Sequence, residues 1–429
     1  MMHISHTLFG VTLGALSLLP GVVKAQSAGA AGTYSNPVLK RDFPDPSVIY
    51  GRDRYFYVYG TDGGGKRTPI YKSRDLTKWR PAGAGFTEAS RPQFVPGANT
   101  WAPEISYVNG QYVMYYSLST WGGEWTCGIG VATSPTPNDA FTDRGKLFIS
   151  SEIGVKNSID PCHFADVDGK QYLFWGSFRG IYGIELSADG LQMKAGAVKF
   201  QIAPQNTIEG TMIYYHNGYY YLMGSQGSCC SGASSTYHVV VARSTSLKGP
   251  YLNKAGKSIM SNPFDVMLRK SDKVCGPGHN SEIIKDDNGK YWMLYHGYQA
   301  SNIDAGRVLF LDQVKWDSNG WPYVEGGKPS ATAEAPVFTT YEAAGIENVN
   351  AQGDDEPAIT LAGQNYYQIS APEGRSFTWT VSDLSGRTVR KGTASGIKDL
   401  WINELSNGVY IINAVQGGQK VSRKVVKCE

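Results

Sequence analysis

The chain has 429 residues, a formal net charge of +3 and 18% charged residues. This charge is too small and too dispersed to indicate binding to nucleic acid or to an anionic membrane surface. The 51 glycines and 12% aromatic residues are typical of turn-rich β structure with aromatic faces that suit flat, apolar ligands such as sugar rings.

Residues 1–25 are predicted to be an export signal. The run from Leu8 to Val23 is mostly apolar, and Val23-Lys24-Ala25 offers small residues for cleavage. Because the run is shorter than the ~20 residues of a membrane span, we expect export without membrane insertion.

Six cysteines in an exported chain allow disulfides, but their spacing shows no zinc pattern. Bridges and free buried thiols are both compatible with the sequence. A bridge between the neighbours Cys229 and Cys230 would be strained relative to ordinary disulfide geometry.

One pattern recurs five times: an opening residue, a short apolar strand, a turn, and a strand crowded with aromatic residues. The opening residues are Asp45, Trp101, Asp160, Glu209 and Asn280. The copies start 56, 59, 49 and 71 residues apart, and repeats of this size built from short strands predict a β-propeller with one four-stranded sheet per repeat. Helical periodicity is almost absent. The fold class is therefore all-β, a five-bladed β-propeller.

After Trp321-Pro322 the pattern fades, and alternation returns at residues 376–381 and 408–412. This predicts a small β-sandwich at the C-terminus. The predicted division is a signal peptide at 1–25, a propeller catalytic domain at 34–330, a linker at 331–356 and the sandwich at 357–429.

The carboxylic acids Asp45, Asp160 and Glu209 occupy the same position in their repeats. The predicted propeller therefore brings them to one mouth of its central channel. Glycoside hydrolysis needs one carboxylic acid and one carboxylate, and a further anion nearby raises the pKa of the acid. Asp before Pro is also a common turn initiator, so Asp45 or Asp160 alone would be weak evidence. Glu209 is not in a preferred turn context, and three acids at one phase favour a site.

Residues 35 to about 325 resemble glycoside hydrolase family 43, whose members are inverting five-bladed-propeller enzymes. The matching segments are NPVLKRDFPDPSVI (36–49), WAPEISYVNGQYVMYYS (101–117), NSIDPCHFADVDGKQYLFWGS (157–177), IEGTMIYYHNGYYYLMGS (208–225) and GPGHNSEIIKDDNGKYWMLYHGY (276–298). The resemblance implies that Asp45 is the general base, Glu209 the general acid, and Asp160 the residue that tunes and orients the acid.

The CC-x-G-x-x-S-x-Y stretch from Cys229 to Tyr237 and the GPGHNS stretch most resemble endo-acting α-1,5-L-arabinanases, which implies cleavage of arabinan. In those enzymes the equivalent of His279 helps to hold a hydrated calcium or similar ion; a buried histidine bonded to the backbone is the alternative. No organic cofactor is expected.

Three further residues are candidates for substrate binding. Trp101 can stack on a sugar face or fill the space between blades, and Ser177 and Arg307 can contact sugar hydroxyls, with His296 a weaker candidate. Two other functions stay open: an exo-acting β-xylosidase or α-L-arabinofuranosidase, suggested by RDFPDPS at 41–47, and a non-catalytic carbohydrate-binding propeller.

Residues 376–427 resemble the sorting domain of the type IX secretion system, through V-x-D-L-x-G-R, L-x-N-G-V-Y and a terminal K-V-V-K. This implies a protein of the cell surface or medium, with a carbohydrate-binding sandwich as the alternative. We expect a monomer whose partner is arabinan or a related plant cell-wall polysaccharide.

Overall fold

The computed structural model describes residues 32–338, 357–363, 366–371, 375–383 and 385–427. The predicted signal peptide, most of the predicted linker and Cys428 lie outside these residues. Regular structure is almost entirely β, and the short helical elements are α1 (Ser150–Ile153), η1 (Gly232–Ser234), η2 (Ile303–Ala305) and η3 (Glu325–Gly327). Within the described ranges, no helix has the length and apolar character needed to span a membrane.

Five antiparallel sheets follow one another along the described part of residues 47–323. The first contains β2 (Ser47–Tyr50), β3 (Phe56–Tyr59), β4 (Arg67–Ser73) and β5 (Arg80–Phe86). The second contains β6 (Asn99–Val108), β7 (Gln111–Ser119), β8 (Gly128–Ser134) and β9 (Thr142–Ile149). The third contains β10 (Cys162–Ala165), β11 (Gln171–Trp175), β12 (Arg179–Glu185) and β13 (Phe200–Gln205). The fourth contains β14 (Glu209–His216), β15 (Tyr219–Gln226), β16 (His238–Ser244) and β17 (Asp265–Leu268). The fifth contains β18 (Val274–Gly278), β19 (Ile284–Lys285), β20 (Tyr291–Gln299), β21 (Arg307–Trp316) and β22 (Pro322–Tyr323).

Both faces of these sheets are buried, which explains why their second strands are apolar almost throughout. Successive side chains of a strand point to opposite faces. In β7, Met114 and Tyr116 pack against the first sheet, whereas Val113 and Tyr115 pack against the third. Similar cores join the third to the fourth sheet and the fourth to the fifth.

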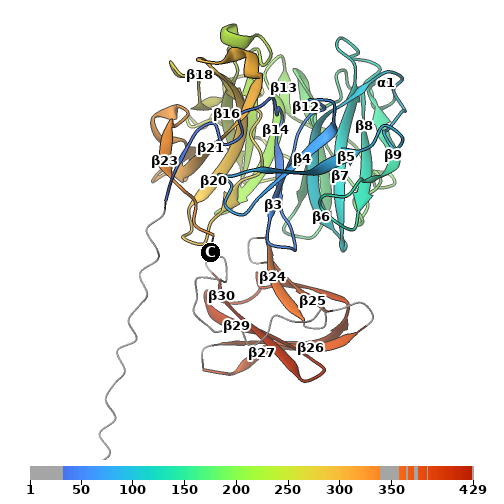
Figure 1. Cartoon of the computed structure of the whole chain (residues 1–429), viewed down its shortest axis with the longest axis vertical. Helices are drawn as coiled ribbons and strands as arrows, with labels where there is room; N and C mark the ends of the chain where they lie inside the picture. The colour runs from blue at the N-terminus through green and yellow to red at the C-terminus, as the bar shows by residue number, and fades with distance from the viewer. Residues whose placement is uncertain (1–31, 339–356, 364–365, 372–374, 384, 428–429) are drawn as a thin grey trace, which may run out of the picture.

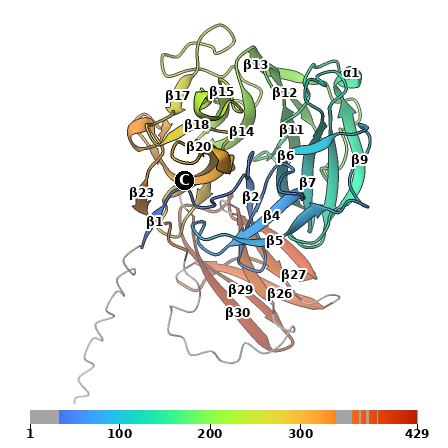
Figure 2. The same cartoon turned by 45° about the horizontal axis from the view of Figure 1, so that its top comes forward.

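The ring closes where the last sheet meets the first. Trp292 and Leu294 of β20 share one core with Val48 and Val58 of β2 and β3. The sheets therefore form a closed β-propeller, and Figure 2 shows them grouped around a common centre.

The N-terminal strand β1 (Thr33–Ser35) pairs with β23 (Thr332–Glu334) at this closure. The Tyr34 hydroxyl donates to the carbonyl of Leu311 at 2.6 Å, and the ring of Phe338 lies 4.5 Å from that of Phe56. Packing with the propeller thus extends to residue 338, so the predicted linker begins too early. A three-residue strand is too short to show an alternation in the sequence.

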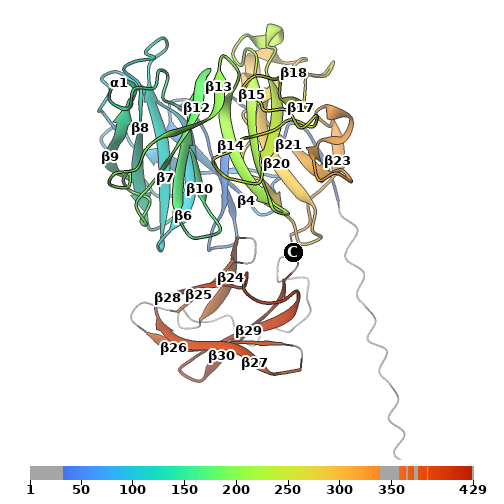
Figure 3. The same ribbon diagram turned by 180° about the vertical axis from the view of Figure 1, so that it is seen from behind.

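Residues 358–427 form two further sheets, which Figures 1 and 3 show in red, apart from the propeller. One contains β24 (Ala358–Gly363), β25 (Tyr366–Ser370) and β28 (Ile397–Trp401). The other contains β27 (Thr388–Ser395), β26 (Ser376–Asp383), β29 (Gly408–Gln416) and β30 (Gln419–Lys427). Ile369 and Leu400 of the first sheet share one hydrophobic core with Trp379, Val381 and Ile412 of the second.

Candidate active site

The innermost strands of the propeller begin near residues with a left-handed backbone. Asp45, Asp160 and His279 have φ values of 57°, 58° and 50°. Gly210, directly after Glu209, has φ of 60°. Such conformations are uncommon for residues other than glycine and concentrate at functional sites.

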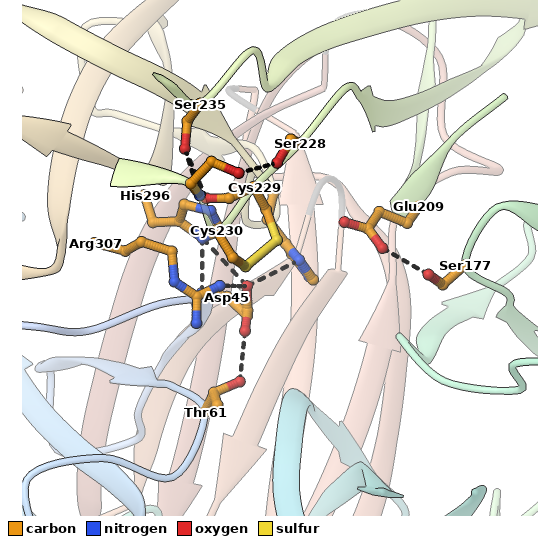
Figure 4. The surroundings of a disulfide bond; sticks show 12 residues. Asp45, Thr61, Ser177, Glu209, Ser228, Cys229, Cys230, Ser235, His296 and Arg307 are labelled. Carbon is orange, nitrogen blue, oxygen red and sulfur yellow. Dashed lines mark hydrogen bonds and ion pairs between the residues drawn. A yellow bond between two sulfur atoms is a disulfide. The ribbon is translucent and has the colours of Figure 1, made fainter. Parts of the chain in front are cut away.

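The carboxylate of Asp45 is surrounded by donors and cations (Figure 4). Thr61 Oγ1 donates to Asp45 Oδ2 at 2.6 Å. His279 Nδ1 lies 3.2 Å and Arg307 Nη1 3.4 Å from Asp45 Oδ1. Burial by itself would raise the pKa of Asp45, but Arg307 and His279 outweigh burial and hold that pKa well below its usual range. Asp45 is therefore ionised.

Two histidines beside Asp45 have opposite charge states. His296 Nδ1 accepts a hydrogen bond from the backbone N–H of Asp45 at 3.0 Å, so this nitrogen carries no proton; burial lowers the pKa of His296 to about 4. Burial also opposes a charge on His279, but Asp45, Asp160 and Glu209 raise its pKa to about 9. The charged ring beside Asp45 is therefore that of His279.

Asp160 and Glu209 lie in a less cationic part of the same site. Asp160 Oδ2 accepts the backbone N–H of Gly210 at 3.1 Å, and Glu209 Oε2 accepts the Ser177 hydroxyl at 2.6 Å. Burial is the main reason that the pKa values of both carboxyls are raised, and the negative charge of Asp45 adds to it. The site thus combines a carboxyl whose pKa is lowered with two carboxyls whose pKa values are raised, and such a difference suits general acid–base chemistry.

The predicted substrate contacts lie at or near this group. Trp101 is half-buried and meets the 83% exposed Trp121 edge to face, with ring centroids 6.2 Å apart. Arg307 faces Asp45, as described above. Ser177 is buried and donates its only hydroxyl hydrogen to Glu209, so in this geometry it supports the acid rather than offering a hydrogen to a sugar.

Two residues that contact this site, Tyr237 and Thr61, are missing from the sequence-based prediction. Tyr237 stacks on His296 with ring centroids 5.6 Å apart, and burial together with the charges of Glu209, Asp160 and Asp45 raises its pKa. Its place at the end of the CC-x-G-x-x-S-x-Y stretch could have drawn attention to it. Thr61 lies beyond the repeated pattern, and no sequence signal indicates its contact with Asp45.

A second pair of acids is formed by Glu104 of β6, which is buried, and Glu282, which precedes β19 and is half-buried; we call it the deep pair. Ser47 Oγ lies 3.1 Å from Glu104 Oε2 and 2.5 Å from Glu282 Oε1. Ser47 can donate its one hydroxyl hydrogen to only one of the two acids, so its contact with the other is a hydrogen bond only if that acid carries a proton. Burial raises the pKa values of both, and the charge of Glu282 further raises that of Glu104.

The residues around His279 do not make a calcium site of the usual kind. Calcium takes six to eight oxygen ligands, whereas within the described residues no cluster of three or more His, Cys, Asp or Glu side chains can hold a metal. His279 itself is positively charged beside Asp45. The hydrated ion near His279 stays a prediction.

Cys229 and Cys230 are joined by a disulfide with their Cα atoms 3.8 Å apart. The sequence alone left open whether these neighbours are bridged. Among the described residues Cys127, Cys162 and Cys275 are free, and the first two are buried.

Comparisons with known proteins agree with this geometry. Residues 34–322 match the family model of Glycosyl hydrolases family 43, and residues 363–428 match a Secretion system C-terminal sorting domain. The chain is 34% identical to the extracellular endo-alpha-(1->5)-L-arabinanase 1 of Bacillus subtilis, over 71% of this chain and 94% of that protein. It is 31% identical to the extracellular exo-alpha-(1->5)-L-arabinofuranosidase ArbA of Cellvibrio japonicus, over 66% and 86%.

Among solved structures, the α-L-arabinanase of Cellvibrio cellulosa complexed with arabinohexaose aligns with a TM-score of 0.60 at 30% identity, covering 66% of this chain and 95% of that one. The sorting domain and the extracellular relatives identify a secreted or cell-surface protein. The propeller matches the family model over nearly its whole length and carries its acids in one buried site. The chain therefore belongs to glycoside hydrolase family 43 and is a glycosidase.

Proposed function

We propose that this glycosidase cleaves α-1,5-linked L-arabinan within the chain and with inversion at the anomeric carbon. The relatives and the structure in complex with arabinohexaose support the substrate. The observation that carries the mechanism is that the surroundings lower the pKa of Asp45, through Arg307 and His279, and raise that of Glu209, through burial.

In the proposed reaction Asp45 accepts a proton from a water molecule while the oxygen of that water attacks the anomeric carbon. Glu209 gives its proton to the departing glycosidic oxygen, and the bond between that oxygen and the anomeric carbon breaks. Inversion requires the two carboxyls to stand roughly 6.5–9.5 Å apart, so that the water fits between them. Asp45 ends protonated and Glu209 ionised, and solvent restores both.

Asp160 is proposed to tune and orient the acid. It accepts the N–H of Gly210 and so fixes the backbone directly after Glu209. Its negative charge disfavours ionisation of Glu209 when Asp160 is itself ionised. Ser177 then holds one oxygen of Glu209 in place.

We further propose that each of the five propeller sheets is one blade and that the two C-terminal sheets pack as a sandwich. The shared cores between neighbouring sheets support the first statement, and the common core of Trp379 with Leu400 supports the second. The proposed domains are the propeller up to residue 338 and the sorting domain from 357. A monomer and the hydrated ion near His279 remain proposals that light scattering and metal analysis can test.

Exo action is the second candidate, because the Cellvibrio japonicus relative is named as an exo-acting enzyme. Digestion of debranched arabinan distinguishes the two: a ladder of oligosaccharides indicates cleavage within the chain, whereas arabinose alone indicates exo action. Proton NMR of the first products gives the anomeric outcome, and retention would refute the mechanism. Glu209→Gln serves as the control, since it keeps the shape of the site and removes the acid.

A further inference from the structure

We propose that the Cys229–Cys230 disulfide forms an apolar wall of the sugar-binding pocket beside Asp45. This proposal rests on the proposed arabinan-cleaving function and extends it to a residue pair with no assigned role. The wall contacts a C–H face of an arabinose unit of the substrate chain.

The position of the disulfide follows from the two ends of its loop, residues 227–237 between β15 and β16. At one end, Ser225 is the register partner of Glu209, and its Oγ accepts the backbone N–H of His279 at 2.8 Å. At the other end, Tyr237 stacks on His296. Both ends are therefore fixed to groups that contact the catalytic carboxyls. Figure 4 shows the S–S bond in the same close-up as Asp45, His296 and Arg307.

Hydrogen bonds within the loop fix its conformation. The N–H of Ser231 donates to Ser235 Oγ at 3.0 Å, and this hydroxyl donates to the carbonyl of Cys229 at 3.4 Å. Ser228 Oγ and Ser231 Oγ lie 2.6 Å apart. Cys230 is exposed and Cys229 is half-exposed.

Stabilisation of the fold does not explain the Cys229–Cys230 disulfide. The stabilisation expected from a disulfide grows with the length of the loop that it closes, and a bridge between adjacent residues encloses no intervening residue. An exposed disulfide instead presents carbon and sulfur atoms that donate no hydrogen bond and accept only weakly. Such a polarisable, apolar surface is suited to the C–H face of a sugar, as an aromatic ring is.

Steady-state kinetics on debranched arabinan test the wall. Cys229→Ser/Cys230→Ser should raise KM about tenfold, which corresponds to about 1.4 kcal/mol, while kcat and the melting temperature stay close to wild type. Cys275→Ser is the matched control, because it removes a free, half-buried thiol and should change neither constant.

Dithiothreitol gives a second readout that needs no mutation. Its thiolate attacks one sulfur of the bridge, which forms a mixed disulfide and releases one cysteine thiol. Its second thiol then attacks the mixed disulfide and releases the other cysteine thiol, leaving cyclic oxidised dithiothreitol. Reduced wild type should take the higher KM of the double variant, and the variant itself should not respond.

An unchanged KM in both the variant and the reduced enzyme overturns the proposal. A parallel fall in kcat and melting temperature also overturns it, because the bridge would then only hold the loop. If wild type leaves arabinan intact, the proposed function fails and the wall proposal fails with it; active wild type with an unresponsive KM refutes the wall alone.

Discussion

Arg307 lowers the pKa of Asp45, the proposed general base, and its removal should move the acidic limb of the pH profile. At the 3.4 Å between Arg307 Nη1 and Asp45 Oδ1, two unit charges attract by about 5 kcal/mol at an effective dielectric constant of ~20. An interaction energy of this size corresponds to about 3.6 pKa units for the interacting carboxyl. It is an upper limit, because the Arg307 side chain is 19% exposed and His279 remains beside Asp45.

Opposite charges at this distance shift a carboxyl pKa by about one to three units in proteins. We therefore expect Arg307→Gln to raise the pKa of Asp45 by that amount. Asp45 must be ionised to accept the proton of water, so activity is lost as pH falls through its pKa. The acidic limb of kcat/KM should move to higher pH by the same one to three units.

The assay is kcat/KM on arabino-oligosaccharides across the acidic range, since this constant reports ionisations of the free enzyme. Arg307→Gln can also weaken substrate binding, so the position of the limb and not its height is the readout. Arg243→Gln is the control. Arg243 donates to the carbonyl of Asn319 and is the register partner of Tyr221. Tyr221 lies four residues along β15 from Ser225, the register partner of Glu209. An active Arg307→Gln enzyme with the wild-type acidic limb would refute the assignment of Asp45.

Three other substitutions test neighbouring parts of the structure. Ser177→Ala removes the hydrogen bond that favours ionised Glu209, so the alkaline limb of kcat/KM should move to higher pH; movement to lower pH would contradict this. In Gly210→Ala, the added Cβ would lie 3.0 Å from the ring of His279, at a backbone φ of 60° that alanine rarely adopts. We expect kcat to fall by about 10²-fold, the cost of a small misplacement in an active site. Near-normal kinetics would argue against tight packing at this position. Glu104→Gln removes one acid of the deep pair. Burial raises the pKa values of both acids, so the protonated pair adds stability below the ordinary glutamate pKa, and this stability is lost as pH rises through the raised values. The melting temperature of the variant should therefore fall less than that of wild type as pH rises above the ordinary glutamate range, and an equal fall would refute the raised pKa values.

The sequence predicted the propeller because its signal is repeated. The second strand of each sheet, such as Gln111–Ser119, is buried on both faces, so its sequence is a nearly continuous run of aromatic and apolar residues. A strand with one face in solvent would instead alternate between apolar and polar residues. The phase of the repeat likewise predicted which acids meet, since equivalent residues begin equivalent strands. The position of a residue within a repeat can be read from a single sequence.

Other features depend on contacts that no repeat encodes. β23 is three residues long and pairs with β1 across about 300 positions of chain, so the linker prediction missed it. The role of Ser177 depends on Glu209 turning toward it from the next sheet. Whether Cys229 and Cys230 are bridged depends on the local backbone, which their adjacency did not determine.

The difference in pKa between Asp45, the proposed base, and Glu209, the proposed acid, arises from the closure of the ring. Asp45 and Glu209 open equivalent strands, so the repeat alone would give them similar surroundings. The cations that lower the pKa of Asp45 are His279, which directly follows β18, and Arg307, which begins β21. Both strands belong to the last sheet, which packs against the first only because the ring closes. Glu209 opens the fourth sheet and receives a neutral hydroxyl from Ser177 of the third. Both carboxyls are buried, but cations gathered at one junction of a near-symmetric ring lower the pKa of Asp45, whereas burial raises that of Glu209, as the proposed base and acid require.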